Sequence, residues 1–344
     1  MSIHRLGIDL AKNVFELCGM DRNGKVVLRN ALRRDQLMEF FAQLPPCQIA
    51  MESCGGAHHW ARFFQASGHE VRLIAPQFVA PYRKISKNDA NDAEAICEAS
   101  GRPTMRFVAI KSTEQQAMLA LHRAQELAKF HLTALGNQVR GLLAEFGVVI
   151  PQGPAQLRKA LQHPIDLETL PPIARNLFRD LFDQRRELTD RLAQYDQQIA
   201  ELSKADAQIQ RLMTIPGVGP VTATAVVATV DNARIFKNGR QFSAWIGLVP
   251  KQKSSGGKSR LLGITERGDI YLRTLLVQGA TTVVHHLGAK EDGRSRWIRA
   301  IMERRGKYKA VVALAARMAC TIWALMTREE NYRVLTNDHP VGHR

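Results

Sequence analysis

The chain has 344 residues, of which 45% are hydrophobic, so it is long enough for two or three domains with real cores. Lysine and arginine number 48 against 32 aspartates and glutamates, which gives a formal net charge of +16. Such an excess of positive charge predicts a polyanionic partner, most simply nucleic acid. Aromatic residues make up only 6% of the chain, which argues against stacking platforms as the main binding mode.

The five cysteines are scattered, and no two form a Cys-x-x-Cys pair. This spacing disfavours structural zinc and is typical of a reducing cytoplasm. The opening residues, MSIHRLGIDLAK, carry charge and lack the apolar core of a signal peptide. No run approaches the roughly eighteen apolar residues of a membrane span. We therefore expect a cytoplasmic protein with no membrane partner.

Residues 1–110 alternate strand and helix signals. Three strands are expected first, in RLGIDLA, VFELCGM and KVVLRNAL, and the Asn23-Gly24 pair between the last two is a strong hairpin signal. A polar helix near 35–43 is followed by strand CQIAMES, helix AHHWARFFQAS and strand EVRLIAP. Helices from about 76 and over KNDANDAEAI close the region. This order predicts an α/β domain with a mixed sheet.

Strand signals vanish from about 112 to 204. One long amphipathic helix is expected from Glu114 to the residue before Gly147, and a second runs from about 173 to 204. Apolar residues of the second helix fall mostly three and four apart, which is typical of a coiled-coil seam. An intramolecular helical hairpin explains the same spacing equally well. The seam residues are Leu181, Leu188, Leu192, Tyr195, Ile199 and Leu202.

The C-terminal region combines helices, glycine turns and dense arginine. We expect a mainly α domain over 206–326 and a polar tail over 327–344, after a helical, coiled-coil segment over 111–205. Within it, IPGVGPVTATAVVA resembles a helix–hairpin–helix element, whose glycine turn can offer backbone N–H groups to a DNA phosphate. A tight turn between two helices without a ligand is the alternative.

Four carboxylates stand at the expected elements of the first domain: Asp9 on the first strand, Glu52 at the end of the fourth, and Asp89 and Asp92 in the first turn of the KNDANDAEAI helix. Residues three apart share one face of a helix. If strands one and four are neighbours, the four side chains can hold one or two Mg²⁺ ions, the arrangement used for phosphoryl transfer. Taken singly, each carboxylate is weak evidence, and an acid pair in a first helical turn is more often a helix cap and a solvated face. The neighbouring His58 and His59 fit the exposed start of a helix better than a metal site.

A second candidate site lies in KSSGGKSR, where two hydroxyls stand among glycines and cations. A serine hydroxyl is a weak nucleophile unless a base or cations activate it, and flanking cations can stabilise charge that develops on a phosphodiester. Ser-Ser-Gly-Gly is also ordinary loop composition. Between residues 251 and 310 there are fourteen cations against five acids, which predicts a nucleic-acid surface with salt-sensitive affinity. Its candidate contacts are Lys251, Lys253, Lys258, Arg260, Arg267 and Arg273.

GIDLAK, AMES and KNDANDAEAI resemble the DEDD motif of RuvC-like insertion-sequence transposases, the bridge-RNA-guided serine recombinases. GLVPKQKSSGG followed by ITERGDIYLR looks like the C-terminal transposase domain of the same family, and the resemblance spans roughly residues 3–325. It implies an RNase H fold for the N-terminal domain. It also implies that Asp9, Glu52, Asp89 and Asp92 bind Mg²⁺ or Mn²⁺, and that the serine before the glycine, Ser255, is the nucleophile, with Ser254 as its neighbour. The family usually has Thr where this chain has Asn88, a position that is not a ligand.

The resemblance further implies a function and partners. The expected activity is RNA-guided cutting and rejoining of donor and target DNA through a serine–DNA covalent intermediate, which mobilises an insertion sequence. The expected partners are both DNAs, a structured bridge RNA recognised largely by shape and backbone, and further copies of the chain in a dimer or tetramer. Such a protein would act at the bacterial nucleoid. The alternative is a Mg²⁺-dependent nuclease of the Holliday-junction type that acts by hydrolysis. A sugar-kinase-like ATPase is disfavoured because the chain lacks a second glycine-rich phosphate motif.

Overall fold

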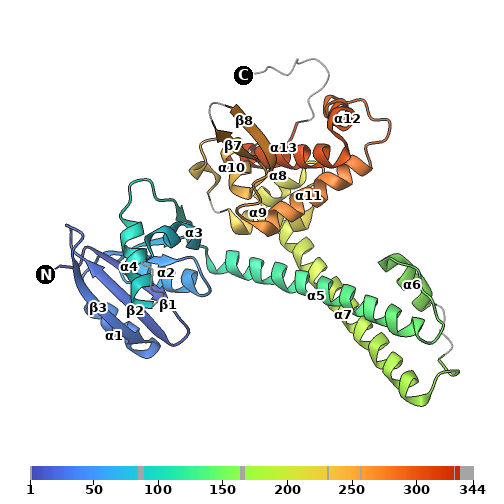
Figure 1. The fold of residues 1–344 in the computed structure, drawn as a ribbon, viewed down its shortest axis with the longest axis horizontal. Coiled ribbons are helices and arrows are strands. Elements are labelled where there is room, and N and C mark those ends of the chain that lie inside the picture. Colours follow the sequence, from blue (N-terminus) through green and yellow to red (C-terminus); the bar gives the residue numbers. More distant parts are fainter. Residues whose placement is uncertain are drawn as a thin grey trace. The chain divides into compact units, whose positions relative to one another are not determined.

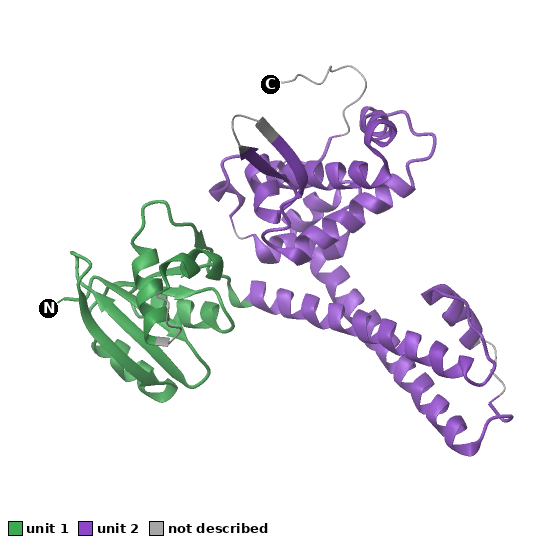
Figure 2. Cartoon of the chain, in the orientation of Figure 1, with its two compact units in different colours: residues 1–113 green, residues 114–344 purple. Residues whose placement is uncertain are grey.

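A computed structural model of the chain describes residues 2–83, 89–162, 167–230, 232–255, 258–328 and 330–333. The chain divides into two units, residues 1–113 and 114–344 (Figure 2). Unit 1 contains the mixed sheet, and unit 2 contains the long helices together with the helical C-terminal region. The predicted mixed α/β N-terminal domain and the mostly helical remainder of the chain are confirmed.

Unit 1 is built on a six-stranded sheet in the order β3-β2-β1-β4-β5-β6. Figure 1 labels β1, β2 and β3 of this sheet. β1 is antiparallel to β2 and parallel to β4, so the two halves of the sheet meet at β1, which is consistent with the expected RNase H-like fold. The expected strands are all present, and a short sixth strand, β6, was not predicted. The strands are β1 (Arg5–Leu10), β2 (Val14–Met20), β3 (Val26–Arg33), β4 (Gln48–Glu52), β5 (Glu70–Ile74) and β6 (Phe107–Val108); the helices are η1 (Arg34–Gln36), α1 (Leu37–Gln43), α2 (Ala57–Ala66), α3 (Pro76–Val79), η2 (Ala80–Tyr82) and α4 (Asp89–Ser100).

The two faces of this sheet are covered differently, because successive residues of a strand point to opposite sides. On one face, Ile8 and Met51 are fully buried in a cluster that includes Trp60 and Phe64 of α2. On the other face, small strand residues lie beneath α4, which packs on β1, β2 and β4. The large-residue face supplies most of the hydrophobic stabilisation, and the small-residue face sets the position of α4.

Unit 2 has one large core around α13, the last long helix. By length and composition α13 could cross a membrane, but half of its most apolar stretch is buried inside the protein, as expected for a core helix. The elements of unit 2 are α5 (Thr113–Ala144), α6 (Pro154–Gln162), α7 (Pro172–Ala205), α8 (Ala207–Met213), α9 (Pro220–Thr229), η3 (Ala233–Ile235), α10 (Gly239–Ile246), β7 (Pro250–Ser255), β8 (Lys258–Ile264), α11 (Ile270–His285), α12 (Gly293–Arg305) and α13 (Lys307–Arg328).

The helices α5 and α7 form an intramolecular pair whose far end is closed by α6 (Figure 1). Leu135 and Val139 of α5 share a buried cluster with Phe178 and Leu181 of α7, and Leu188 packs against it. Part of the predicted coiled-coil seam is therefore used inside the chain. The helical-hairpin alternative accounts for these contacts, and pairing of this seam between chains stays a prediction.

A buried polar group joins α5 to α9 and α11. His122 is 1% exposed, and its Nδ1 lies 2.9 Å from the Tyr271 hydroxyl. Its Nε2 lies 3.0 Å from the Thr224 hydroxyl. Burial lowers the pKa of His122 to about 4, so the ring is neutral at physiological pH.

Candidate active site

Asp9 and Glu52 lie at corresponding positions on two neighbouring strands. β1 and β4 are parallel, with Ile8 opposite Met51, and Asp9 and Glu52 are the next residue of each strand. Ile8 and Met51 are buried toward α2, so the alternation of the strands directs Asp9 and Glu52 to the opposite face. That is the face beneath α4. β1 and β4 are neighbours in the sheet, as the sequence analysis assumed.

The close approach of α4 depends on Gly7, which precedes Asp9 by two residues and shares its face. A Cβ at Gly7 would lie 2.3 Å from the backbone oxygen of Ala93 and 2.6 Å from the nitrogen of Cys97. Only glycine permits this contact between β1 and the helix. The contact brings the first turn of α4, which begins at Asp89 and includes Asp92, over the strand that carries Asp9. The Asp89 side chain lies outside the described part of the structure.

One arginine binds two of the carboxylates. The Arg83 guanidinium donates from Nη2 to Oε1 of Glu52 at 2.7 Å, and its Nε lies 3.1 Å from Oδ1 of Asp92. Glu52 and Asp92 thus meet at one guanidinium, and Asp9 stands on the strand next to that of Glu52. The structure brings Glu52 and Asp92 together through Arg83, a residue that the sequence analysis missed. That Asp9 shares a metal site with them stays a prediction.

The candidate serine lies at the tip of a β-hairpin in unit 2. β7 and β8 are antiparallel, with Ser255 opposite Lys258, Ser254 opposite Ser259 and Lys253 opposite Arg260. The Ser254 hydroxyl accepts a hydrogen bond from the Gln252 side chain at 2.9 Å. Gly256 and Gly257, and the side chains of Ser255, Lys258 and Ser259, lie outside the described part. Lys251, Lys253 and Arg260 are exposed.

The base of this hairpin is fixed by two glycines with positive φ. Gly247 (φ 84°) follows α10, and a Cβ there would lie 2.1 Å from the Arg267 oxygen. Gly268 (φ 85°) approaches the Trp245 oxygen, which would be 1.8 Å from a Cβ. Arg273 donates to the backbone oxygens of Ile246 at 2.9 Å and Arg267 at 3.2 Å. The GLVP and ITERGD motifs are therefore one packed unit, in which the Arg273 charge holds two loops together.

Two regions of the chain match known protein families, and the whole chain is similar to known transposases. Residues 6–147 match the DEDD transposase domain of the IS110 type, and residues 209–298 match the Transposase IS116/IS110/IS902 family. A probable family 20 transposase of Pseudomonas aeruginosa is 49% identical over 97% of this chain and 99% of its own length.

The chain belongs to the IS110 family of insertion-sequence transposases.

Other similar proteins agree with this assignment. The transposase for insertion sequence element IS1111A of Coxiella burnetii is 43% identical over 95% of this chain and 91% of its own length. The transposase for element IS1328 of Yersinia enterocolitica is 39% identical over 94% of this chain and 96% of its own length. The two family matches fall on the two regions that carry the carboxylates and the serine hairpin.

The DEDD domain of this transposase suggests a divalent metal ion, and the described residues partly fit one. Among the described side chains there is no cluster of three or more metal-ligating groups. The Asp89 side chain is not one of the described side chains. The available donors are nevertheless carboxylate oxygens, which Mg²⁺ and Mn²⁺ prefer. Two of these carboxylates, Glu52 and Asp92, already converge on a single cationic group. The site is therefore suited to a cation.

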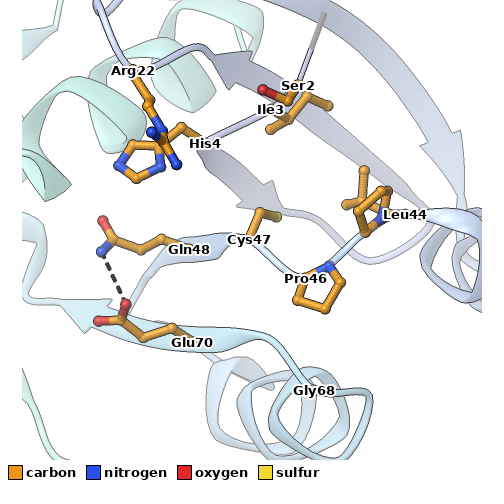
Figure 3. A pocket seen from close by; sticks show the side chains of 11 residues that line it. Ser2, Ile3, His4, Arg22, Leu44, Pro46, Cys47, Gln48, Gly68 and Glu70 are labelled. Atoms are coloured by element: carbon orange, nitrogen blue, oxygen red, sulfur yellow. Dashed lines mark hydrogen bonds between the residues drawn. The ribbon is translucent and has the colours of Figure 1, made fainter.

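Other features of the transposase lie apart from this site or have structural roles. The His58 ring accepts a hydrogen bond from the Lys111 backbone at 3.2 Å, so it anchors the segment that leads into α5. A pocket near His4, Cys47 and Gln48 lies at the starts of β1 and β4, at the opposite end of those strands from Asp9 and Glu52 (Figure 3).

The glycine turn between α8 and α9 is packed against α11. A Cβ at Gly217 would lie 2.8 Å from the Gly279 oxygen, and Gly217 has a φ of 91°. This packing explains why the predicted helix–hairpin–helix element needs glycine at its first glycine position. Gly219, the N-cap residue of α9, is exposed.

Proposed function

We propose that this transposase cuts and rejoins donor and target DNA through a covalent serine–DNA intermediate, with metal bound by Asp9, Glu52, Asp89 and Asp92. The observation that carries the metal site is the convergence of Glu52 and Asp92 on one guanidinium, beside Asp9 of the adjacent strand. Bound Mg²⁺ or Mn²⁺ would stabilise the charge of the phosphodiester and of the leaving oxygen. The protein's own task is to hold the four carboxylates at one end of β1 and β4.

Ser255 is the proposed nucleophile. Its Oγ forms a bond to phosphorus as the bond from phosphorus to a sugar oxygen breaks, and the serine proton passes through solvent to the leaving oxygen. One phosphodiester replaces another, so the reverse reaction can rejoin a strand without an external energy source. The family match over residues 209–298 and the position of Ser255 at a hairpin tip among exposed cations support this assignment.

The proposed DNA contacts are made by the hairpin and the loop after it. Exposed Lys253 and Arg260 are paired across the two strands, and Lys251 and Arg267 are exposed on either side of them. Cations at these positions neutralise phosphates and stabilise charge that develops on the scissile phosphate. Lys258 pairs with Ser255 in the strand register, and Arg273 supports the loops from beneath. These six cations comprise the proposed nucleic-acid surface of the hairpin.

The proposal extends to a bridge RNA and to assembly. A net charge of +16 supports binding of more than one nucleic acid, and an RNA that pairs with DNA can supply sequence specificity. The protein would act as a dimer or tetramer at the bacterial nucleoid in the cytoplasm. RNA guidance is wrong for this chain if recombination by RNase-treated protein proceeds at the same rate on the same target.

Hydrolysis by the metal site alone is the second candidate function. One observation favours it: Asp9, Glu52, Asp89 and Asp92 all belong to unit 1, so the site needs no residue of unit 2 to be assembled. In that case the serine would be structural, and cleavage would leave no protein attached to DNA.

Ser255→Ala, with Ser254→Ala as its matched control, separates the two functions. Labelled donor DNA is mixed with each protein, and a denaturing gel is examined for a protease-sensitive shifted band. We expect the band for wild type and Ser254→Ala and none for Ser255→Ala, which should bind DNA normally because Lys253 and Arg260 remain. A band of wild-type intensity from Ser255→Ala would exclude Ser255 as the nucleophile. Clean cuts without a band in any variant would favour hydrolysis.

A further inference from the structure

The ion pairs of Arg83 occupy the oxygens that a metal would need. Two nitrogens of one planar guanidinium, Nη2 and Nε, hold Oε1 of Glu52 at 2.7 Å and Oδ1 of Asp92 at 3.1 Å. Charge-assisted hydrogen bonds of this kind are directional, so both oxygens are aimed at a common region. Arg83 follows η2 and comes from outside the sheet and α4. It is an additional component of the site rather than part of its scaffold.

A resident cation is needed here because the carboxylates are poorly hydrated. The Glu52 side chain is 13% exposed and that of Asp92 is 11% exposed, with Asp9 on the adjacent strand. Like charges held together at low exposure repel each other unless a positive group neutralises them. Arg83 supplies that charge, and its own side chain is 35% exposed. It can therefore leave toward solvent without uncovering the core.

We propose that Arg83 is a built-in counter-cation that a divalent metal must displace, so that it sets the metal affinity of the site and keeps Glu52 and Asp92 converged before metal binds. This inference rests on the proposed metal-dependent function. Mg²⁺ and Mn²⁺ bind carboxylate oxygens directly, and an oxygen that accepts a guanidinium hydrogen bond offers the metal a weaker ligand. The two cations consequently compete for the same sites. Arg83 acts as a positioning residue through Glu52 and Asp92.

A second arginine, which pairs with another carboxylate of α4, provides a matched control. Arg29 of β3 pairs with Glu94 of α4 at 2.6 Å, two residues after Asp92. Arg29→Gln and Arg83→Gln each remove one positive charge and one arginine from unit 1. Only Arg83→Gln frees oxygens of the candidate metal site. Comparison of the two variants separates direct competition from a general change in charge.

The experiment measures Mn²⁺ binding to full-length, nucleic-acid-free protein, with free Mn²⁺ followed by electron paramagnetic resonance. Loss of two partly exposed ion pairs should lower the Kd of Arg83→Gln about tenfold relative to wild type. Arg29→Gln should stay within about twofold of wild type, because surface pairs contribute little to a neighbouring site. Without metal, Arg83→Gln should unfold at a lower temperature than wild type, and saturating Mn²⁺ should raise its unfolding temperature by more than it raises that of wild type.

The outcomes distinguish this inference from the function on which it rests. Equal or weaker Mn²⁺ binding by Arg83→Gln, with wild type binding normally, overturns the role of Arg83 and leaves the metal site intact. An equal gain in affinity for Arg29→Gln also overturns it, because the effect would then be general charge. If neither wild type nor Arg83→Gln binds Mn²⁺, the proposed metal site is refuted. The proposed competition between Arg83 and the metal is then refuted as well.

Discussion

The buried His122 should make unit 2 lose stability in mild acid. The Thr224 hydroxyl donates its single proton to the Pro220 oxygen at 2.7 Å, so it can only accept from the imidazole. Nε2 of His122 therefore carries the proton, and Nδ1 accepts from the Tyr271 hydroxyl. Both ring nitrogens are satisfied in the neutral form. A second proton would place a charge in this buried site, where burial first and then the positive charge of Lys129 disfavour it, which agrees with a pKa lowered to about 4.

The sign and size of the effect follow from linkage. The unfolded chain binds a proton at this histidine near its usual pKa of about 6.5, whereas the folded protein resists it until the pH approaches about 4. The stabilisation is therefore complete above about pH 6.5 and is lost as the pH falls toward about 4. Between pH 7.5 and 4.5 the loss in free energy of unfolding should be about 2 to 3 kcal/mol.

The test compares wild type with His122→Gln. Glutamine can still reach Thr224 but does not titrate, so the variant should be about 1 kcal/mol less stable at pH 7.5 because it loses the bond to Tyr271. On acidification to pH 4.5, its free energy of unfolding should fall by about 2 to 3 kcal/mol less than that of wild type. Urea unfolding followed by tryptophan fluorescence, with Trp60→Phe in both proteins, reports unit 2 alone. Parallel pH profiles for the two proteins would refute the neutral, proton-excluding role of His122.

Three further predictions concern the sheet, the metal site and the hairpin. Gly7→Ala should destabilise unit 1 by about 2 kcal/mol, because its Cβ would lie 2.3 Å from the Ala93 oxygen; a thermal unfolding midpoint equal to that of wild type would contradict this packing. Asp92→Asn should abolish DNA cleavage in Mg²⁺ while circular dichroism shows an intact fold, and full cleavage by this variant would remove Asp92 from the site. Lys253→Gln should reduce the slope of log affinity against log salt by about 0.9 for duplex DNA, and an unchanged slope would show that Lys253 contacts no phosphate.

The order of elements in unit 1 could be predicted because its signals are local. Alternation identifies the strands, Asn23-Gly24 identifies the hairpin, and the helix signals separate the later strands. The motifs at Asp9, Glu52 and Asp92 could likewise be placed at the ends of strands and the start of a helix. β6 was missed because two residues carry no periodicity. The seam of α7 stayed ambiguous because the same spacing serves a partner helix in the chain or in another copy.

Arg83 and His122 show what local signals cannot contain. Arg83 stands in a polar segment, where nothing in the sequence separates it from other solvated cations, and its partners lie 31 and 9 residues away. His122 falls within an amphipathic helix, and it is buried only because residues 102 and 149 positions further along the chain cover it.

Most elements of unit 1, and the residue types able to perform phosphoryl transfer, could be predicted because backbone propensity and side-chain chemistry belong to each residue. The contact of Glu52 and Asp92 with Arg83 could not, because it depends on the fold. Burial, repulsion between carboxylates and the satisfaction of hydrogen bonds arise only when segments distant in the chain are packed together.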